Sequence, residues 1–228
     1  MDDPFRMYLV VRRGAFGDLE TGGVLAGAAA VACLRRFSAD PAYAPAIEAW
    51  RDRPGKVTLR ARGGQWPELL ATEPHALAGD PDGASVVALP PRRRSERSEL
   101  LTKLQAMSSA LEPPQHEDEP RRVPGRVTYV LNPRLTMSSG KTLAQIAHAA
   151  TAAAGAPDLA GWVDAGCPAR VVLPAPEAFR ALCGSPGLAA EIADAGLTEV
   201  PPGTVTVLAL APAGDDQARL NTQRRPTR

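Results

Sequence analysis

Two stretches of the chain share the same order of apolar and polar positions. Residues 7–12 form a short β-branched and aromatic run, and an Ala-rich segment of helical length follows at 24–36. The same order recurs at 127–131 and 141–154, where a glycine ends the Ala-rich segment. Each stretch therefore predicts a strand followed by a helix.

The two stretches align over most of their length. The alignment places Gly140 on Gly22, and the later apolar run at 207–212 matches the run at 86–91. Such a long repeat is not that of a solenoid, so we interpret it as a duplicated domain whose halves pack like the subunits of a dimer. The other interpretation is two generic α/β units whose patterns coincide by chance.

The segment between the copies predicts a connecting helix and then a linker. From Ser95 to Leu111, apolar residues recur at helical spacing and indicate a face turned to the core. Residues 113–120 are polar and Pro-rich, which is typical of an exposed linker. The predicted divisions are a degenerate copy, the connection, the second copy and a flexible basic tail, at 1–91, 92–125, 126–216 and 217–228.

Composition leaves the choice of partner open. Hydrophobic residues make up 44% and charged residues 22% of the 228 residues, as in an ordinary soluble globular protein. The net charge of +1 neither demands nor excludes a nucleic-acid partner. Three cysteines without metal-ligand spacing fit a reducing compartment, and the N-terminus lacks a long apolar run. We therefore expect a cytoplasmic protein with no membrane partner and no metal.

Residues Ser139 to Thr142 resemble the end of a nucleotide-binding loop, because Gly-Lys-Thr follows a predicted strand and opens a helix. That loop requires a glycine five places before Gly140, and the residue there is Leu135. A leucine hinders a backbone wrapped around a phosphate, which argues against ATP or GTP binding. The helix start with its lysine still favours an anion, such as an RNA phosphate or a developing oxyanion.

Polar side chains gather on one stripe of the second predicted helix. Lys141, Gln145 and His148 stand at i, i+4 and i+7, whereas a merely solvated face would also show such a stripe. The string Gly-Lys, three residues, Gln, two residues, His-Ala resembles the signature of type 2 peptidyl-tRNA hydrolases, the archaeal and eukaryotic type. The segment 191–208, with Asp-Ala-Gly and Pro-Gly-Thr-x-Thr-Val-Leu, is similar to a second segment of that family.

The resemblance spans about 126–212 and implies both a fold and an activity. The implied fold is α/β, with two related units that each hold a small mixed β-sheet with helices on both faces, packed as a pseudo-dimer. The implied activity is hydrolysis of the ester of peptidyl-tRNA, without cofactor or metal, by a monomer acting as a pseudo-dimer or by a homodimer. The residues that it implies are catalytic Lys141, Asp194 and Thr198, with Gly140, Gln145, His148 and Thr204 as supporting or substrate-binding groups.

Four of these residues have an assigned task. Asp194 would orient or deprotonate the water with Thr198 as its hydrogen-bond partner, although it could equally cap a turn. Lys141 would hold the oxyanion or a phosphate. Thr204 would hold the loop or touch the substrate, and a plain turn role is equally open.

Four positions depart from the family pattern and leave the activity open. They are Asn132, Arg134, Ser139 and Glu199, where the family usually has arginine, aspartate, a basic residue and glutamine. These changes remove or reverse charge at the entrance of the predicted site. The alternative function is therefore a catalytically weak relative that binds RNA or another protein.

The first copy lacks the polar stripe. The alignment places Gly23, Gly27 and Ala30 on Lys141, Gln145 and His148, so this copy is interpreted as a structural partner. A sharper hypothesis is that it is a platform for tRNA, although surface arginines are commonly just solvated. The arginines that would form the platform are Arg12, Arg13, Arg35, Arg36 and Arg92 to Arg94.

Overall fold

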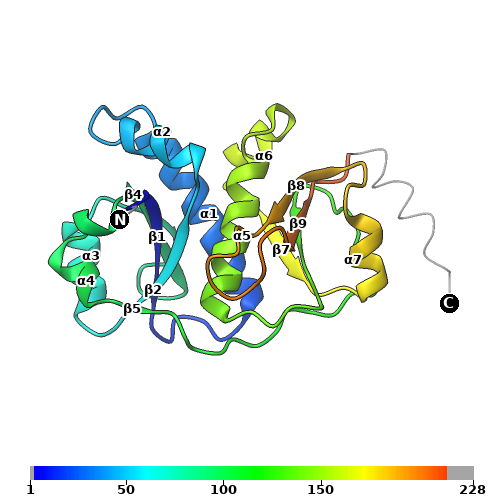
Figure 1. Cartoon of the computed structure of the whole chain (residues 1–228), viewed down its shortest axis with the longest axis horizontal. Coiled ribbons are helices and arrows are strands. Elements are labelled where there is room, and N and C mark those ends of the chain that lie inside the picture. The colour runs from blue at the N-terminus through cyan, green and yellow to red at the C-terminus, as the bar shows by residue number, and fades with distance from the viewer. Residues whose placement is uncertain (1–2, 215–228) are drawn as a thin grey trace.

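Two mixed β-sheets lie on either side of a pair of long helices, α1 and α5, in the computed structural model, which describes residues 3–214 (Figure 1). The first sheet has the strand order β3-β4-β1-β2-β5, and the second has the order β7-β6-β9-β8. The strands are β1 Arg6–Arg12, β2 Lys56–Ala61, β3 Ala76–Gly79, β4 Ser85–Arg92, β5 Gln105–Ala106, β6 Val127–Leu131, β7 Ala169–Val172, β8 Leu188–Ala193 and β9 Val205–Leu210. The α/β class with two mixed sheets is confirmed.

Seven α-helices and two 3-10 helices connect the strands of the described region. The helices are α1 Leu19–Phe37, α2 Ala44–Asp52, α3 Gln65–Thr72, α4 Glu99–Lys103, α5 Ser139–Ala153, α6 Ala160–Asp164 and α7 Pro176–Leu182, with η1 Arg94–Glu96 and η2 Pro157–Leu159. None of the helices between residues 3 and 214 is long and apolar enough to cross a membrane. The predicted basic tail, 217–228, lies outside the described residues.

The two units have the same topology. In the first, β1 pairs with β2 in parallel and with β4 antiparallel, and β4 pairs with β3. In the second, β6 pairs with β7 in parallel and with β9 antiparallel, and β9 pairs with β8. In each unit the central strand leads into the long helix. This shared order supports the predicted duplication, because two unrelated α/β units need not connect their strands alike.

The helix caps correct the predicted alignment of the copies. Asp18 caps α1 and accepts a hydrogen bond from the N–H of Thr21, just as Ser138 caps α5 and accepts one from Lys141. Lys141 therefore corresponds to Thr21, not to Gly23. The apolar pattern misplaced the helix because small residues recur throughout both Ala-rich helices. The lysine, glutamine and histidine are still absent from the first copy, because counting along the helices places Leu25 and Ala28 at the positions of Gln145 and His148, and only Thr21 keeps a polar side chain.

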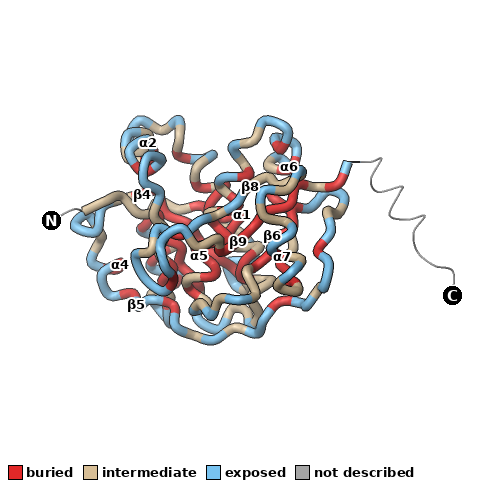
Figure 2. The backbone as a smooth tube through the Cα atoms, turned by 45° about the vertical axis from the view of Figure 1, so that its right-hand side comes forward, coloured by how far each residue is buried: buried red, intermediate tan, exposed pale blue. Residues whose placement is uncertain are grey.

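The central helices belong to both cores. α1 and α5 pack against each other, and each also packs against the parallel strand of the opposite unit, α5 on β2 and α1 on β7. Leu143 of α5 is fully buried in the core of the first sheet, and Val31 of α1 is buried in the core of the second. Figure 2 shows the buried residues concentrated along this middle layer. The units therefore stabilise each other through apolar burial rather than through a flexible tether.

The outer face of each sheet has its own small core. Helices α3 and α4 cover the first sheet around Leu59, Leu69 and Leu101, and α7 covers the second around Phe179. The order of layers is thus helix, sheet, paired helices, sheet, helix (Figure 1). This arrangement confirms the expectation of helices on both faces of each sheet.

The connecting helix predicted from Ser95 to Leu111 is wrong outside residues 99–103. Helix α4 has five residues, and Gln105–Ala106 then pairs with β2 as an edge strand. The apolar stripe is divided by this edge, because Leu100 and Leu104 pack in the outer core whereas Met107 packs in the inner one. Beyond it, the Pro-rich linker is mostly exposed, and its residues 115–117 exchange backbone hydrogen bonds with Leu173.

Candidate active site

The site begins at the capped N-terminus of α5. The Ser138 hydroxyl accepts a hydrogen bond from the N–H of Lys141 at 3.2 Å, which satisfies one of the free amides of the first turn. The N–H and hydroxyl of Ser138 in turn both donate to the Glu199 carboxylate at 2.6 Å. Glu199 lies in the loop between β8 and β9, which curves over α5 in Figure 1. The cap therefore ties this loop to the start of the helix, where a carboxylate is also favoured by the helix dipole.

Asp194, at the start of this loop, is the centre of a hydrogen-bonded cluster. Its Oδ2 accepts hydrogen bonds from Lys141 Nζ and from Gln145 Nε2, the latter at 2.7 Å. Its Oδ1 accepts one from the N–H of Gly196 at 2.8 Å. Lys141 also donates to Thr198 Oγ1 at 3.1 Å. Four of the predicted site residues, Lys141, Gln145, Asp194 and Thr198, are thus brought together.

The cluster is largely withdrawn from water. The side chains of Lys141 and Asp194 are 13% and 6% exposed, and Gln145 is 4% exposed as a whole. The buried hydroxyl of Thr206 donates to Gln145 Oε1 at 2.6 Å, which orients the amide so that its N–H group faces Asp194. Charge-assisted hydrogen bonds in such surroundings are stronger than in water. Thr206 lies in the second family-like segment, although no role was predicted for it.

The backbone of the loop holds Asp194 in place. The N–H of Asp194 donates to the carbonyl of Thr204 at 2.9 Å, and the N–H of Gly203 donates to the carbonyl of Asp194 at 2.8 Å. Gly196 has a φ of +74°, and a Cβ on it would lie 2.6 Å from the ring of Pro202, so glycine is required there. Thr204 therefore supports the site through its backbone carbonyl.

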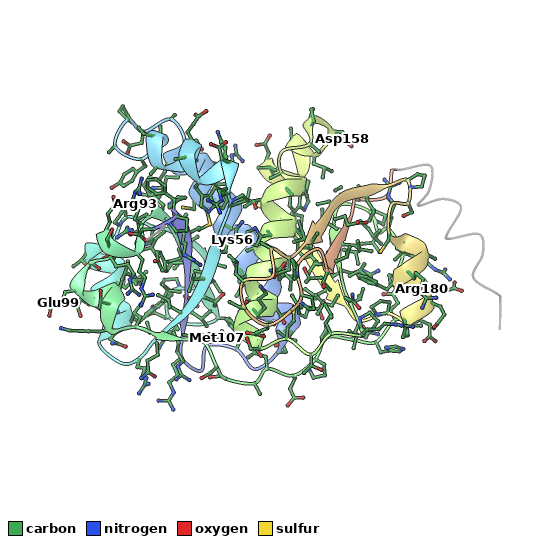
Figure 3. The ribbon with its side chains drawn as sticks, viewed as in Figure 1. Lys56, Arg93, Glu99, Met107, Asp158 and Arg180 are labelled. Carbon is green, nitrogen blue, oxygen red and sulfur yellow. The ribbon has the colours of Figure 1, made fainter. Side chains whose placement is uncertain are left out.

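The first unit and the connecting segment hold the other side of the helix start. A Cβ on Gly140 would lie 2.6 Å from the Met107 carbonyl oxygen, so glycine is required for the backbone at Met107 to lie this close to the start of α5. The hydroxyl of Thr58 in β2 donates a hydrogen bond to the Gly140 carbonyl at 2.9 Å. Figure 3 labels Met107 near the lower end of α5. Gly140 is thus a packing position beside the cluster rather than a member of it.

His148 lies outside the Asp194 cluster, although it was predicted on the same stripe. Its Nδ1 is 3.1 Å from Lys56 Nζ, which also donates to Thr151 Oγ1 at 3.0 Å and lies 4.6 Å from the centre of the Trp50 ring. Burial lowers the pKa of His148 well below its ordinary value, and the charges of Lys56 and Lys141 lower it further. Burial likewise lowers the pKa of Lys56. Two turns of helix separate His148 from Lys141, which explains why one stripe serves two separate clusters.

Thr198 was predicted to bond Asp194, but its hydrogen bond is to Lys141. Three of the departures from the family pattern make contacts within the protein. Besides Glu199 on the cap, Ser139 Oγ accepts from the N–H of Leu111 at 3.0 Å, and Asn132 Nδ2 donates to the Val205 carbonyl at 2.7 Å. These three residues thus form hydrogen bonds within the protein around the site.

Arg134 behaves differently from the other departures. Its guanidinium lies 3.9 Å from the Glu177 carboxylate, and both side chains are more than half exposed. An ion pair of this kind contributes little to stability.

The arginines suggested as a tRNA platform do not share one surface. Arg12 lies at the carboxyl end of β1, whereas Arg92 pairs with Arg6 at the opposite end of that strand. Arg36 lies in the last turn of α1, which runs back from the carboxyl end of β1. Only Arg12 and its neighbour Arg13 lie at the end of the sheet nearest the start of α5, so the predicted platform is not formed as a unit.

Comparison with known proteins identifies the second unit. Residues 126–224 match the family model of Peptidyl-tRNA hydrolase PTH2. Residues 126–224 are therefore similar to the proteins of that family. The match begins immediately before β6 and includes every member of the Asp194 cluster, so the resemblance read from the sequence is confirmed. No solved structure matches the chain.

The matched family is that of a peptidyl-tRNA hydrolase, and the match covers the site. Within residues 3–214, no group of three or more His, Cys, Asp or Glu side chains is arranged to hold a metal ion. The Asp194 cluster offers a carboxylate, an ammonium, an amide and two hydroxyls.

Proposed function

We propose that this protein hydrolyses the ester that joins a peptide to the terminal ribose of tRNA, and that the Lys141–Gln145–Asp194 cluster is its site. The observation that carries the proposal is the buried carboxylate held by these side chains within the family-matched unit. An ester requires an activated water and a group that stabilises negative charge on oxygen. Asp194 would provide the first and Lys141 the second.

The hydrogen bonds leave one position open on each of these groups. Each carboxylate oxygen has two lone-pair directions, so Asp194 Oδ2 is filled by Lys141 and Gln145, and among the described residues Oδ1 accepts only the N–H of Gly196. A water would bind at Oδ1 and transfer a proton to it as its oxygen attacks the carbonyl carbon. The carbon–oxygen bond to the ribose then breaks, and the ribose oxygen takes up the proton that Asp194 received, which returns Asp194 to its carboxylate form.

Lys141 carries three N–H donors, of which two point to Asp194 and Thr198. The third would donate to the oxyanion of the tetrahedral intermediate or to a phosphate of the acceptor end. Thr198 is exposed, and its hydroxyl hydrogen would donate to the substrate while its oxygen holds Lys141. Gln145 would keep Asp194 in the orientation needed for the water.

The test is cleavage of N-blocked aminoacyl-tRNA, followed as release of the blocked amino acid. We expect turnover by the wild-type protein and a fall of at least about 100-fold in kcat/KM for Lys141→Ala and for Asp194→Ala. The control is Lys103→Ala, which removes an exposed lysine that pairs with Glu99 and lies outside the Asp194 cluster. Turnover equal to wild type in both site variants would discard the site, and no turnover by a folded wild-type protein would discard the activity in favour of a binding role.

A further inference from the structure

Strand β2 of the first unit presents a row of polar side chains to the helix that holds the site. Alternate residues of a strand face the same side, so Lys56, Thr58 and Arg60 share one face of β2. Lys56 and Thr58 both reach side chains or backbone of α5. We call these three residues the polar row. Figure 3 shows Lys56 between the first sheet and α5.

The equivalent positions of the second unit are apolar. The alignment set by the helix caps makes Leu9 of β1 and Tyr129 of β6 equivalent. Thr58 lies opposite Leu9 in the first sheet and Val171 lies opposite Tyr129 in the second, so Thr58 and Val171 are equivalent as well. The row on β7 that corresponds to the polar row therefore consists of Ala169, Val171 and Leu173. It packs in the apolar core against α1. The same fold thus carries an apolar row against the helix without a site and a polar row against the helix with one.

The polar row contacts α5 at two places. Thr58, which is 6% exposed, bonds the carbonyl of Gly140, the residue that immediately precedes Lys141. Two turns further along, Lys56 contacts His148 and Thr151. Two contacts separated along its length define both the position of a helix along its axis and its rotation, and a rotation of α5 would move the Lys141 ammonium relative to Asp194.

Stability alone does not explain this row. Lys56 is partly buried, its contacts are with His148, Thr151 and the Trp50 ring, and no carboxylate of residues 3–214 acts on its charge. The row on β7 demonstrates that apolar side chains satisfy the same packing position. The polar contacts are therefore better explained by the position of α5, which they hold.

We propose that Thr58 and Lys56 are positioning residues of the hydrolase site, through which the first unit orients the helix that carries Lys141. The proposal rests on the proposed function and extends it, because it makes the site dependent on the copy that lacks the site residues. Loss of one hydrogen bond that orients a reacting group lowers the rate by about 3- to 10-fold. The ground-state affinity for tRNA should not change, since neither residue is placed against the substrate.

The experiment compares Thr58→Val, Thr58→Ser and Lys56→Met in the full-length protein. We expect Thr58→Val and Lys56→Met to lower kcat by about 3- to 10-fold with KM within about twofold of wild type. Thr58→Ser keeps the hydroxyl and should restore kcat to within about twofold. Lys103→Met is the matched control, because it removes the same charge from the same unit without touching α5. A fall in kcat that serine does not restore would mark Thr58 as structural only and overturn the proposal.

A second measurement does not depend on turnover. Amide hydrogen exchange of residues 139–142 reports how firmly the first turn of α5 is held, and we expect Thr58→Val to increase it several-fold relative to Thr58→Ser. Unchanged exchange together with unchanged kcat in Thr58→Val and Lys56→Met would refute the positioning role. Absence of wild-type turnover would refute the proposed function instead, and exchange would then decide whether the first unit holds α5.

Discussion

Replacing Lys141 by methionine removes the cation of a buried ion pair but keeps most of the side-chain volume. The two side chains are 13% and 6% exposed, so water screens the pair only weakly. Two unit charges about 4 Å apart at an effective dielectric constant of about 20 attract each other by about 4 kcal/mol. Removing one partner of a buried pair costs about 3–5 kcal/mol. Gln145 and the N–H of Gly196 still stabilise Asp194, so we expect the lower end, about 3 kcal/mol.

Urea unfolding followed by circular dichroism measures this loss directly, and a fall in Tm of roughly 6–12 °C should accompany it. The variant Lys141→Met/Asp194→Leu removes both charges and should recover part of the stability, because no uncompensated charge remains buried. Neither variant should retain ester hydrolysis. A loss below about 1 kcal/mol in Lys141→Met would show that the pair behaves like an exposed one, and would refute the buried electrostatic cluster on which the site is built.

Three further predictions concern the surroundings of the cluster. Gln145→Leu should cost about 1–3 kcal/mol in urea unfolding, because it removes the buried hydrogen bonds that the amide makes with Asp194 and Thr206; a neutral result would contradict the assigned amide orientation. Gly140→Ala should cost more than about 1 kcal/mol, since the Met107 carbonyl blocks a Cβ, and equal stability of the two proteins would count against that contact. Burial lowers the pKa of His148 in the folded state, so the unfolded chain binds a proton first as the pH falls below about 6.5. Unfolding free energy should therefore decrease below that pH by at most about 1.4 kcal/mol per unit, and His148→Leu should flatten the dependence; an identical slope in the variant would contradict the burial.

Local sequence patterns were sufficient to predict the main strands and helices and to find the family resemblance. Apolar periodicity located β1, β6, α1 and α5 because a core-facing residue recurs with the period of its element. The spacing of Lys141 and Gln145 placed both on one helix face, and the second family-like segment supplied Asp194 and Thr198. Periodicity failed from residue 104 to 111, where the apolar residues face two different cores across a sheet edge.

The sequence by itself determined that the second unit resembles the peptidyl-tRNA hydrolase family and that Lys141 and Gln145 share one helix face, because short-range spacing encodes which side chains share a face. Only the tertiary structure decided what surrounds these side chains. Thr206 on Gln145, Thr58 on Gly140 and Lys56 on His148 join residues that are 61, 82 and 92 positions apart, and no local period reports such pairs. They exist because two sheets pack on one pair of helices, and that packing makes the first unit part of the environment of α5.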